Sequence, residues 1–505
     1  MHIVTANEMY EIDRFAIENA GVDGTILMEN AGRAIAEKVV SLVKKSEEIL
    51  VLVGSGNNGG DGFVIAKTLL NQGYKPTVLQ LAANEKIKGA ALYHKQLFIN
   101  YGGTIQQLQA SDEITVFLNN TDVVIDAMLG IGITGTLRPP FDQVIKAVNE
   151  VDKLTISVDI PSGVPADEGV LDFIGIEADY TFVIEEPKMS VFLEHCTAYY
   201  GNWSVVKIGL PHQAYANQIK RNTWVEQKVR TTLPSRDAFS HKGSHGRGLI
   251  IGGSRQMPGS VAMTALASLR AGSGLITIAT VKEAISSIAQ QCLEATFLPL
   301  ASQEGVISER QQIDISTYDA IAIGMGMGRK KDTGLLTRKI VAKAKVPVLI
   351  DADGLYHISE ELSVITNRKS PTILTPHFGE MAMLLDTTIQ NVIAHPFSLA
   401  ESFSRKHGVY LVLKGPNTIV SDPEGNQWVN TTGNAGLAKG GSGDVLSGIL
   451  LAMIMQRQKM TEALSNGCFI HGKAADNLVV KKHSEQDLLA TDVIKGLASV
   501  FRTFS

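Results

Sequence analysis

The stretch VGSGNNGGDG, residues 53–62, decides how the first half of the chain folds. Its glycines follow the pattern G-x-G-x-x-G, between an apolar run at 49–53 and an apolar segment at 63–71 for which we expect a helix. A glycine-rich turn from a strand into a helix is typical of dinucleotide-binding folds, because the backbone approaches a pyrophosphate closely there. Asp61 is unusual in such a loop, since its charge would repel a phosphate at the helix N-terminus. The pattern alone therefore leaves a plain tight turn open as an alternative.

Polar side chains at the ends of other strands favour a binding site. The strand after the glycine loop ends near Gln80, so the carboxylate that holds the ribose of an ordinary NAD cofactor is missing. Asp126 ends VVIDAM and Asp159 ends TISVDI, each before a glycine-containing loop. The carboxyl ends of parallel strands meet at one sheet edge, where ligands bind. A single strand-end aspartate is more often a helix cap, but Asp61, Asp126 and Asp159 together predict one site.

Apolar runs alternate with helical segments in both halves of the chain, which predicts an α/β fold with parallel sheets. Between them, the polar segment 216–234 has no apolar periodicity, and we place a boundary there. The expected domains are 1–215 and 237–505. The strand-like runs lie at 49–53, 77–81, 122–128, 154–160, 180–184 and 203–208 in the first half, and at 248–253, 275–280, 319–324, 347–353, 371–376 and 410–415 in the second.

Composition excludes several classes of protein. A chain of 505 residues with 44% hydrophobic and 19% charged residues is typical of a two-domain globular protein. The net charge of -5 gives no reason to expect nucleic-acid binding. The start lacks signal-peptide character and the most apolar segment, 448–455, is too short to span a membrane, so we expect no membrane association. Three widely spaced cysteines predict reduced thiols in a cytoplasmic protein.

Three stretches of the first half resemble the NAD(P)H-hydrate epimerase family over roughly residues 1–210: VGSGNNGGDGFVIA, VVIDAMLGIGITGT and SVDIPSGV. The resemblance implies a Rossmann-like, three-layer domain that binds a hydrated nicotinamide nucleotide as substrate. Asp159 would contact this substrate and act as the acid/base group, and a potassium ion would be held by Asn58, Asp126 and Ser162. The substrate pocket would be lined by Asn57, Asn58, Gly59, Gly60 and Asp61, with Gly130, Ile131, Gly132, Ile133, Thr134, Gly135 and Thr136 around the phosphates.

One stretch departs from the family pattern. A phenylalanine-glycine pair is expected before Pro187 and Lys188, but the chain reads IEEPKMS at 184–190. The second acidic residue puts the local packing in question rather than the site.

In the second half, the stretch NAGLAKGGSGD (434–444) precedes the apolar run VLSGILLAMIM. Glycines that open a helix provide converging N–H groups and a positive helix end, and so an anion hole. Asp444 is expected either as the N-cap of this helix or as a base that removes a proton from a hydroxyl attacking a phosphoryl group. The chain has no G-x-x-x-x-G-K-[ST] motif, so it is not a P-loop enzyme.

The GGSGD motif resembles the ribokinase-like superfamily. HKGSHGRGLIIGGSRQMPGS (241–260), GMGMG (324–328), DADGL (351–355), TPHFGE (375–380) and KGPNT (414–418) narrow the resemblance to the ADP/ATP-dependent NAD(P)H-hydrate dehydratases, over roughly 237–505. The resemblance implies a ribokinase-like α/β domain in which Gly326, His377 and Asp444 contact the hydrated substrate. A structural role for His377 remains the alternative. The phosphate-donating nucleotide would be held by Lys414, Gly415, Pro416, Asn417, Thr418 and Gly443.

The two resemblances imply one function. The first domain would interconvert the R and S forms of NADHX and NADPHX, and the second would dehydrate the S form at the expense of ADP or ATP, with ADP favoured and Mg²⁺ neutralising charge. With Asp444 as the base, phosphorylation would turn the ring hydroxyl into a good leaving group. The electrons of the ring nitrogen would then expel phosphate. AMP or ADP and phosphate are the other products, and a homo-oligomer is expected.

Two other functions remain possible from the sequence. The first is a ribokinase-like vitamin or sugar kinase fused to a Rossmann-like binding domain, which would release a stable phosphoester instead of phosphate. The second is a binding scaffold, since domains resembling the first half also occur as RNA-decapping or lipoprotein-binding partners. A scaffold need not retain Asp126, Asp159 and the complete NNGGD loop, and their presence favours catalysis.

Overall fold

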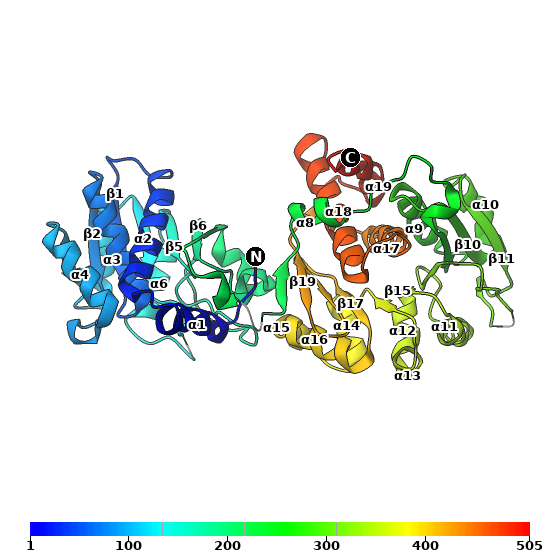
Figure 1. The fold of residues 1–505 in the computed structure, drawn as a ribbon, viewed down its shortest axis with the longest axis horizontal. Helices are drawn as coiled ribbons and strands as arrows, with labels where there is room; N and C mark the ends of the chain where they lie inside the picture. Colours follow the sequence, from blue (N-terminus) through cyan, green and yellow to red (C-terminus); the bar gives the residue numbers. More distant parts are fainter. Residues whose placement is uncertain (134, 216–218, 310, 505) are drawn as a thin grey trace. The chain divides into compact units, whose positions relative to one another are not determined.

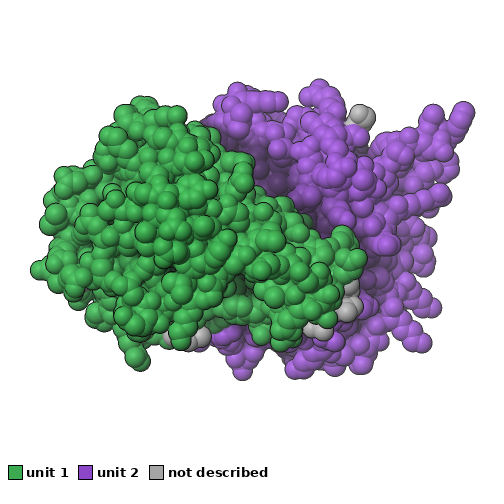
Figure 2. Space-filling model, turned by 60° about the vertical axis from the view of Figure 1, so that its left-hand side comes forward, with its two compact units in different colours: residues 1–219 green, residues 220–505 purple. Residues whose placement is uncertain are grey.

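The computed structural model describes residues 1–133, 135–215, 219–309 and 311–504. The chain forms two compact units, Met1–Ile219 and Lys220–Ser505 (Figure 2). Each unit is α/β, as the alternation of strands and helices predicts (Figure 1). No helix among the described residues is long and apolar enough to cross a membrane.

The first unit is built on a seven-stranded parallel sheet with the order β3-β2-β1-β4-β5-β6-β7. The chain leaves β1 on one side toward β2 and returns on the other side at β4, so a ligand-binding crevice is expected where these strands end. The strands are β1 Glu48–Val53, β2 Lys75–Gln80, β3 Thr104–Gln107, β4 Val123–Ala127, β5 Leu154–Val158, β6 Tyr180–Ile184 and β7 Asn202–Val206.

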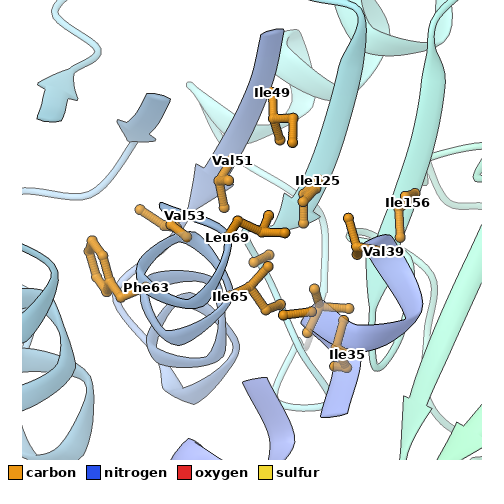
Figure 3. Packing of buried hydrophobic residues seen from close by; sticks show 14 of the residues in the cluster. Ile35, Val39, Ile49, Val51, Val53, Phe63, Ile65, Leu69, Ile125 and Ile156 are labelled. Atoms are coloured by element: carbon orange, nitrogen blue, oxygen red, sulfur yellow. The ribbon is translucent and has the colours of Figure 1, made fainter. Parts of the chain in front are cut away.

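Both faces of this sheet are covered, which confirms a three-layer arrangement. Val51 and Val53 pack with Phe63 and the helices of one face (Figure 3). Leu50 and Leu52 point to the other face and pack with residues of α6. Each fully buried aliphatic side chain contributes roughly 1.5–3 kcal/mol. The helices of the unit are α1 Ala6–Arg14, α2 Gly24–Val40, α3 Asn57–Asn71, α4 Gly89–Asn100, α5 Ile114–Asn119, α6 Phe141–Asn149 and α7 Glu194–Thr197.

One local feature of the first unit differs from expectation. The helix that was expected from Phe63 begins at Asn57, so Asp61 lies inside the first turns of α3 and not in a loop. At the N-terminus, Thr5 and Glu8 form a capping box at the start of α1. A π-helical turn at Phe15–Asn19 follows α1, and Ile17 within this turn is 45% exposed.

The second unit contains a ten-stranded sheet with the order β11-β10-β9-β14-β15-β16-β17-β18-β19-β8. Its pairs are parallel except β17–β18 and β18–β19. The strands are β8 Arg221–Thr223, β9 Arg247–Ile251, β10 Leu275–Val281, β11 Thr296–Leu300, β14 Ala320–Ile323, β15 Val348–Ile350, β16 Thr372–Leu374, β17 Tyr410–Leu413, β18 Thr418–Ser421 and β19 Gln427–Asn430, with the hairpin β12 Ser302–Gln303 and β13 Val306–Ile307 separate.

The polar segment 216–234 is not simply a connection. Residues 216–218 lie outside the described residues, but β8 pairs in parallel with β19, and α8 (Glu226–Thr232) follows it. Trp224 adds a buried hydrogen bond from its indole N–H to Oδ1 of Asn466, at 3.0 Å. The second unit therefore starts at Lys220, before the expected start at residue 237, because an edge strand and a buried tryptophan bind this segment to it.

One helical group of the second unit carries the glycine-rich motif. Helices α9, α17, α18 and α19 share an apolar core. A side chain at Gly448 of α17 would place its Cβ 2.1 Å from the carbonyl oxygen of Thr264, so the two helix backbones of α17 and α9 are in contact. The helices are α9 Pro258–Arg270, α10 Lys282–Ala289, α11 Lys331–Lys343, α12 Asp353–Ser359, α13 Ser363–Thr366, α14 Phe378–Leu385, α15 Ile389–Ala394, α16 Pro396–His407, α17 Ser442–Ile454, α18 Met460–Lys481 and α19 Ala490–Phe501.

Candidate active sites

A cavity of about 1020 Å³ lies where β1, β4 and β5 end in the first unit. Thr134 lies outside the described residues, and Gly59 and Gly60 do not line this cavity. The remaining residues predicted around the substrate do line it: Asn57, Asn58, Asp61, Gly130, Ile131, Gly132, Ile133, Gly135, Thr136 and Asp159.

The glycines at positions 54, 56, 59 and 60, in the turn after β1 and at the start of α3, have different roles. A Cβ at Gly54 would lie 1.9 Å from the carbonyl oxygen of Met128, and one at Gly59 would lie 2.3 Å from that of Gly54. Gly60 packs in the same way against Met28. Only Gly56 has open space around its Cβ position, and it lines the cavity. Most of the motif thus allows tight packing of the loops and α3.

Asp159 follows β5 in a left-handed conformation, with φ of 65°. Its Oδ1 accepts a hydrogen bond from the amide of Ile184, at 2.9 Å, and forms an ion pair with the ammonium of Lys188. Lys188 is 1% exposed and also donates to the carbonyl oxygen of Ile184. These contacts with a buried ammonium and a backbone amide fix the Asp159 carboxylate at the cavity wall.

Two further carboxyl groups line the same cavity. Burial raises the pKa of Asp13 to about 6. The charges of Asp159 and Glu185 reinforce this shift, and the charge of Lys188 opposes it. Burial and the nearby charges of Asp159 and Asp13 raise the pKa of Asp61 well above its usual range. The raised pKa of Asp61 weakens the objection from the sequence that its charge would repel a phosphate.

Sequence reasoning missed Asp13 and the pairing of Lys188. Asp13 lies four residues after Met9, which points into the core of this unit, so the helical period could have indicated that it faces inward. Lys188 follows a proline at the end of a strand, and nothing in that local pattern identifies its partner.

The predicted potassium ligands lie together. Asp126 is 0% exposed, and its oxygens accept hydrogen bonds from the backbone N–H and hydroxyl of Ser162, the hydroxyl of Ser157 and the N–H of Met128. Burial raises the pKa of Asp126, and these hydrogen bonds oppose the shift. No cationic side chain among the described residues forms an ion pair with it.

Asn58 completes this group. Its amide donates to the carbonyl oxygen of Leu129, at 2.8 Å, and the hydroxyl of Ser162 contacts the same residue. Oδ1 of Asn58 is buried and has no hydrogen-bond partner among the described residues. A buried carboxylate without a cation and an unpartnered amide oxygen fit a monovalent cation, which prefers oxygen ligands.

The IEEPKMS stretch has a packing explanation. Glu185 accepts hydrogen bonds from the amide of Ile208 and from the hydroxyl of Tyr215. Glu186 forms an ion pair with Lys207, at 2.6 Å. Both acidic residues are buried and are contacted by the segment after β7, so this departure from the family pattern is accommodated.

In the second unit, Asp444 lies in the first turn of α17 but is not its N-cap. The helix begins at Ser442, and Gly441, with φ of 93°, occupies the cap position. The alternative of Asp444 as an N-cap is therefore wrong. Burial and the repulsion of Asp351 raise the pKa of Asp444 to about 6, while a hydrogen bond with Ser260 and the charge of Lys414 oppose the shift.

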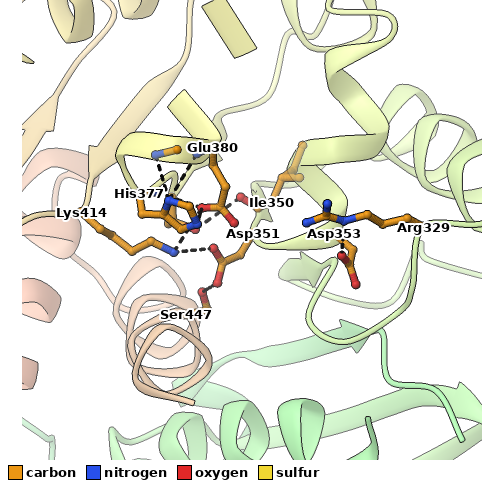
Figure 4. Close-up of polar contacts among 10 residues, drawn as sticks. Arg329, Ile350, Asp351, Asp353, His377, Glu380, Lys414 and Ser447 are labelled. Carbon is orange, nitrogen blue, oxygen red and sulfur yellow. Dashed lines mark hydrogen bonds and ion pairs between the residues drawn. The ribbon is translucent and has the colours of Figure 1, made fainter. Parts of the chain in front are cut away.

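Figure 4 shows a charged network that contains Asp351, Glu380 and Lys414. Asp351 and Lys414 are close enough to Asp444 to shift its pKa. The ammonium of Lys414 donates to Oδ1 of Asp351, at 2.9 Å, and lies 3.8 Å from the carboxylate of Glu380. The hydroxyl of Ser447 donates to Oδ2 of Asp351, at 2.7 Å. Burial alone would raise the pKa of Asp351, but Lys414 and these hydrogen bonds lower it.

The structure brings most of the other predicted residues to this place. A Cβ at Gly443 would lie 3.5 Å from Nζ of Lys414. Gly326 has φ of 61°, and a Cβ there would lie 2.9 Å from Ser260, the hydroxyl partner of Asp444. Lys414, Gly415, Pro416, Asn417 and Thr418 form the turn from β17 into β18.

His377 pairs with Lys414 through a backbone bridge, and its ring caps α14. Nδ1 of His377 accepts hydrogen bonds from the amides of Gly379 and Glu380, at 3.0 and 3.3 Å. The other ring nitrogen lies 3.6 Å from the carboxylate of Glu380, and the side chain is 59% exposed. Capping therefore leaves one edge of the ring accessible to a ligand.

Comparison with known proteins gives matches over both units. Residues 24–190 match the family model described as YjeF-related protein N-terminus, and residues 248–498 match that of NAD(P)H-hydrate dehydratase. The bifunctional NAD(P)H-hydrate repair enzyme of Moorella thermoacetica is 33% identical, over 99% of this chain and 97% of its own. The corresponding enzyme of Escherichia coli is 30% identical over 98% and 93% of the two chains.

A solved structure resembles the second unit. The ADP/ATP-dependent NAD(P)H-hydrate dehydratase of Bacillus subtilis, crystallised with ATP and Mg²⁺, superposes with a TM-score of 0.51 at 33% identity. The match covers 56% of this chain and 99% of that one. A ribokinase-like protein of Enterococcus faecalis, 23% identical with a TM-score of 0.50, shares the fold.

Proposed function

The chain belongs to the family of bifunctional NAD(P)H-hydrate repair enzymes, and from that premise we propose how its two units divide the work. The first unit epimerises the R and S forms of NADHX and NADPHX in the cavity at the ends of β1, β4 and β5. The second unit dehydrates the S form at Asp444. The observation that carries this division is that each unit has its own group of buried carboxylates with a lysine ion pair.

In the first unit, Asp159 exchanges a proton with the substrate. Its carboxylate lines the cavity and is held by Ile184 and Lys188, so its position is fixed before the substrate binds. The loop from Gly130 to Thr136 surrounds the phosphates. A potassium ion would be held by Asn58, Asp126 and Ser162, where it would neutralise the buried carboxylate and fix the loops that line the cavity.

In the second unit, Asp444 removes the proton from the ring hydroxyl as that oxygen attacks the terminal phosphoryl group. The N-terminus of α17 offers backbone N–H groups to the phosphates, and Lys414 supplies a positive charge beside them. Mg²⁺ would neutralise charge on the nucleotide. A pKa of about 6 leaves Asp444 largely ionised at neutral pH, as a base must be.

The nucleotide is ADP in preference to ATP, and the turn 414–418 with Gly443 holds it. Support comes from the relative of Bacillus subtilis, which is named as ADP/ATP-dependent and was crystallised with ATP and Mg²⁺. We also propose a cytoplasmic location and a homo-oligomer. Three buried free cysteines, Cys196, Cys292 and Cys468, agree with a reducing compartment.

A single assay tests the proposal. The full chain is incubated with R-NADHX or S-NADHX and with ADP or ATP, and both NADH absorbance and free phosphate are followed. We expect NADH from both epimers with equal release of phosphate, and faster turnover with ADP. A stable phosphoester without NADH would indicate a kinase instead. If S-NADHX but not R-NADHX yielded NADH, the first unit would not be an epimerase.

A further inference from the structure

The epimerase cavity contains more acidic groups than one substrate contact requires. Asp13, Asp61 and Asp159 all line it, and the basic side chains among its described lining residues are Arg138 and Lys188. Lys188 is ion-paired with Asp159. Burial, reinforced by the nearby carboxylate of Asp159, raises the pKa of Asp13 to about 6 and raises that of Asp61 as well. The cavity therefore favours a proton on these two groups more than water does.

Asp13 and Asp159 come from different parts of the fold. Asp159 directly follows β5, whereas Asp13 lies in the last turn of α1, whose Met9 and Ile12 pack with Ile131. A Cβ at Gly132 would lie 2.8 Å from the hydroxyl of Tyr10, so α1 is in direct contact with the segment that follows β4. The cavity thus has one carboxyl group in an ion pair with Lys188 and another, on a different element, that forms no ion pair among the described residues.

Inversion of the hydrate requires proton transfer at two oxygen atoms. The ring carbon carries both the hydroxyl and the ring nitrogen, so the hydroxyl can leave as water while the nitrogen lone pair forms a C=N bond. A second water then attacks the other face of that carbon. The first step needs an acid and the second a base, and a single carboxyl group cannot readily serve both faces.

Building on the epimerase function proposed above, we propose that Asp13 is a second catalytic residue of epimerisation, the acid that protonates the departing hydroxyl while Asp159 takes the proton of the incoming water. The C–O bond breaks with both electrons going to oxygen, and the proton of Asp13 completes the water. The new C–O bond forms from the incoming water, and the C=N electrons return to nitrogen. The opposite conversion uses the same groups with their roles exchanged, and nothing is oxidised or reduced.

Asp61 is less suited to this role. It lies in the second turn of α3, is 7% exposed and is more deeply buried than Asp13. Its position in the cavity lining fits a hydrogen bond to the substrate, and its raised pKa favours the protonated, donating form.

The test uses the full chain, with R-NADHX, excess ADP and NADH absorbance as the readout. In Asp13→Asn, the rate from R-NADHX should fall about 10²–10⁴-fold, while the rate from S-NADHX stays at the wild-type value. Glu11→Gln is the matched control, because it removes the same charge from an exposed position on α1. Asp13→Glu, which restores an acid, should recover part of the rate. An Asp13→Asn rate within threefold of wild type would overturn the proposal.

Two measurements on the wild type do not depend on how a variant folds. Epimerisation from the R form in H₂¹⁸O should place ¹⁸O on the ring carbon with each inversion, and product that retains its original oxygen would overturn the proposal. The R-form rate should also fall as the pH rises through about 6, because Asp13 must be protonated. The groups that face Asp13 are Tyr10, Asp61, Asp159, Glu185, Lys188 and Tyr215, and Asp13→Asn should abolish this limb of the profile.

The outcomes separate the two proposals. If the wild type does not use R-NADHX at all, the epimerase function of the first unit fails. If the wild type interconverts the epimers and Asp13→Asn does so equally well, only the role of Asp13 fails.

Discussion

The ammonium of Lys414 lies 2.9 Å from Oδ1 of Asp351, and this ion pair lies beside Asp444. Asp351 is 1% exposed, so its charge is stable only because Lys414 and Ser447 contact it. The pair has two effects on Asp444. Asp351 repels the charge of Asp444 and makes it more basic, whereas Lys414 keeps that carboxyl ionisable at neutral pH.

Removal of Lys414 should destabilise the second unit as well as inactivate it. Lys414→Met leaves Asp351 as an unpaired buried charge, which typically costs about 3–5 kcal/mol in the free energy of unfolding. Urea unfolding measures this loss. Adding Asp351→Asn should restore part of the stability but not the dehydration, and Lys343→Met, at an exposed position of α11, should leave both unchanged. Equal stability of Lys414→Met and wild type would contradict the ion-pair interpretation.

Gly54 and Gly56, in the turn between β1 and α3, provide a matched pair of substitutions. Gly54→Ala should destabilise the first unit by about 1–3 kcal/mol or more, because its Cβ would lie 1.9 Å from the carbonyl oxygen of Met128. Gly56→Ala meets nothing within 4 Å and should cost less than about 1 kcal/mol. Gly56 lines the cavity, so its substitution should instead raise the KM for R-NADHX. Thermal unfolding and steady-state kinetics separate the two effects, and similar melting of both variants would contradict this division of roles.

The potassium site should affect stability independently of catalysis. K⁺ should raise the melting temperature of the wild-type chain, by an amount that corresponds to about 2.7 kcal/mol at 100 times the Kd. Li⁺ at equal ionic strength is the control. Asp126→Asn, which keeps the volume but removes the charge, should lose this dependence and epimerise slowly. A wild-type melting temperature that is the same in both salts would exclude the site.

The sequence predicted those features that depend on local patterns. The alternation of apolar runs predicted the strands, and the glycine motifs predicted the ends of the sheets where the sites lie. The start of α3 at Asn57 was missed, because asparagines and glycines are poor helix formers and tertiary packing of Gly59 and Gly60 overrides that preference.

Long-range pairing was the other part that the sequence did not predict. Lys188 and Asp159 are buried together, and Lys414 contacts Asp351 across 63 positions of sequence. The strand β8 was missed for a related reason: it is a short, polar edge strand whose identity depends on β19 as a neighbour.

Asp444 should determine the rate and pH dependence of dehydration without affecting folding. Because Gly441 is the N-cap, Asp444→Asn removes no cap and nearly preserves the volume. It removes the proton acceptor, so phosphate release with S-NADHX and ADP should fall about 10²–10⁴-fold. In the wild type the base must be ionised, so the rate should decline as the pH falls through about 6.

The stability of the wild type should depend on pH in the sense opposite to its dehydration rate, and Asp444→Asn should remove this dependence. Burial raises the pKa of Asp444 to about 6 in the folded state, so its protonated form is favoured by folding. The wild type therefore loses stability as the pH rises from the usual range of an aspartate through about 6, and the asparagine variant should not. Thermal unfolding at pH 5 and pH 8 measures this difference, with epimerisation of R-NADHX to S-NADHX as the control for an intact first unit. Near-normal dehydration by a variant that folds in this way would show that another group is the base.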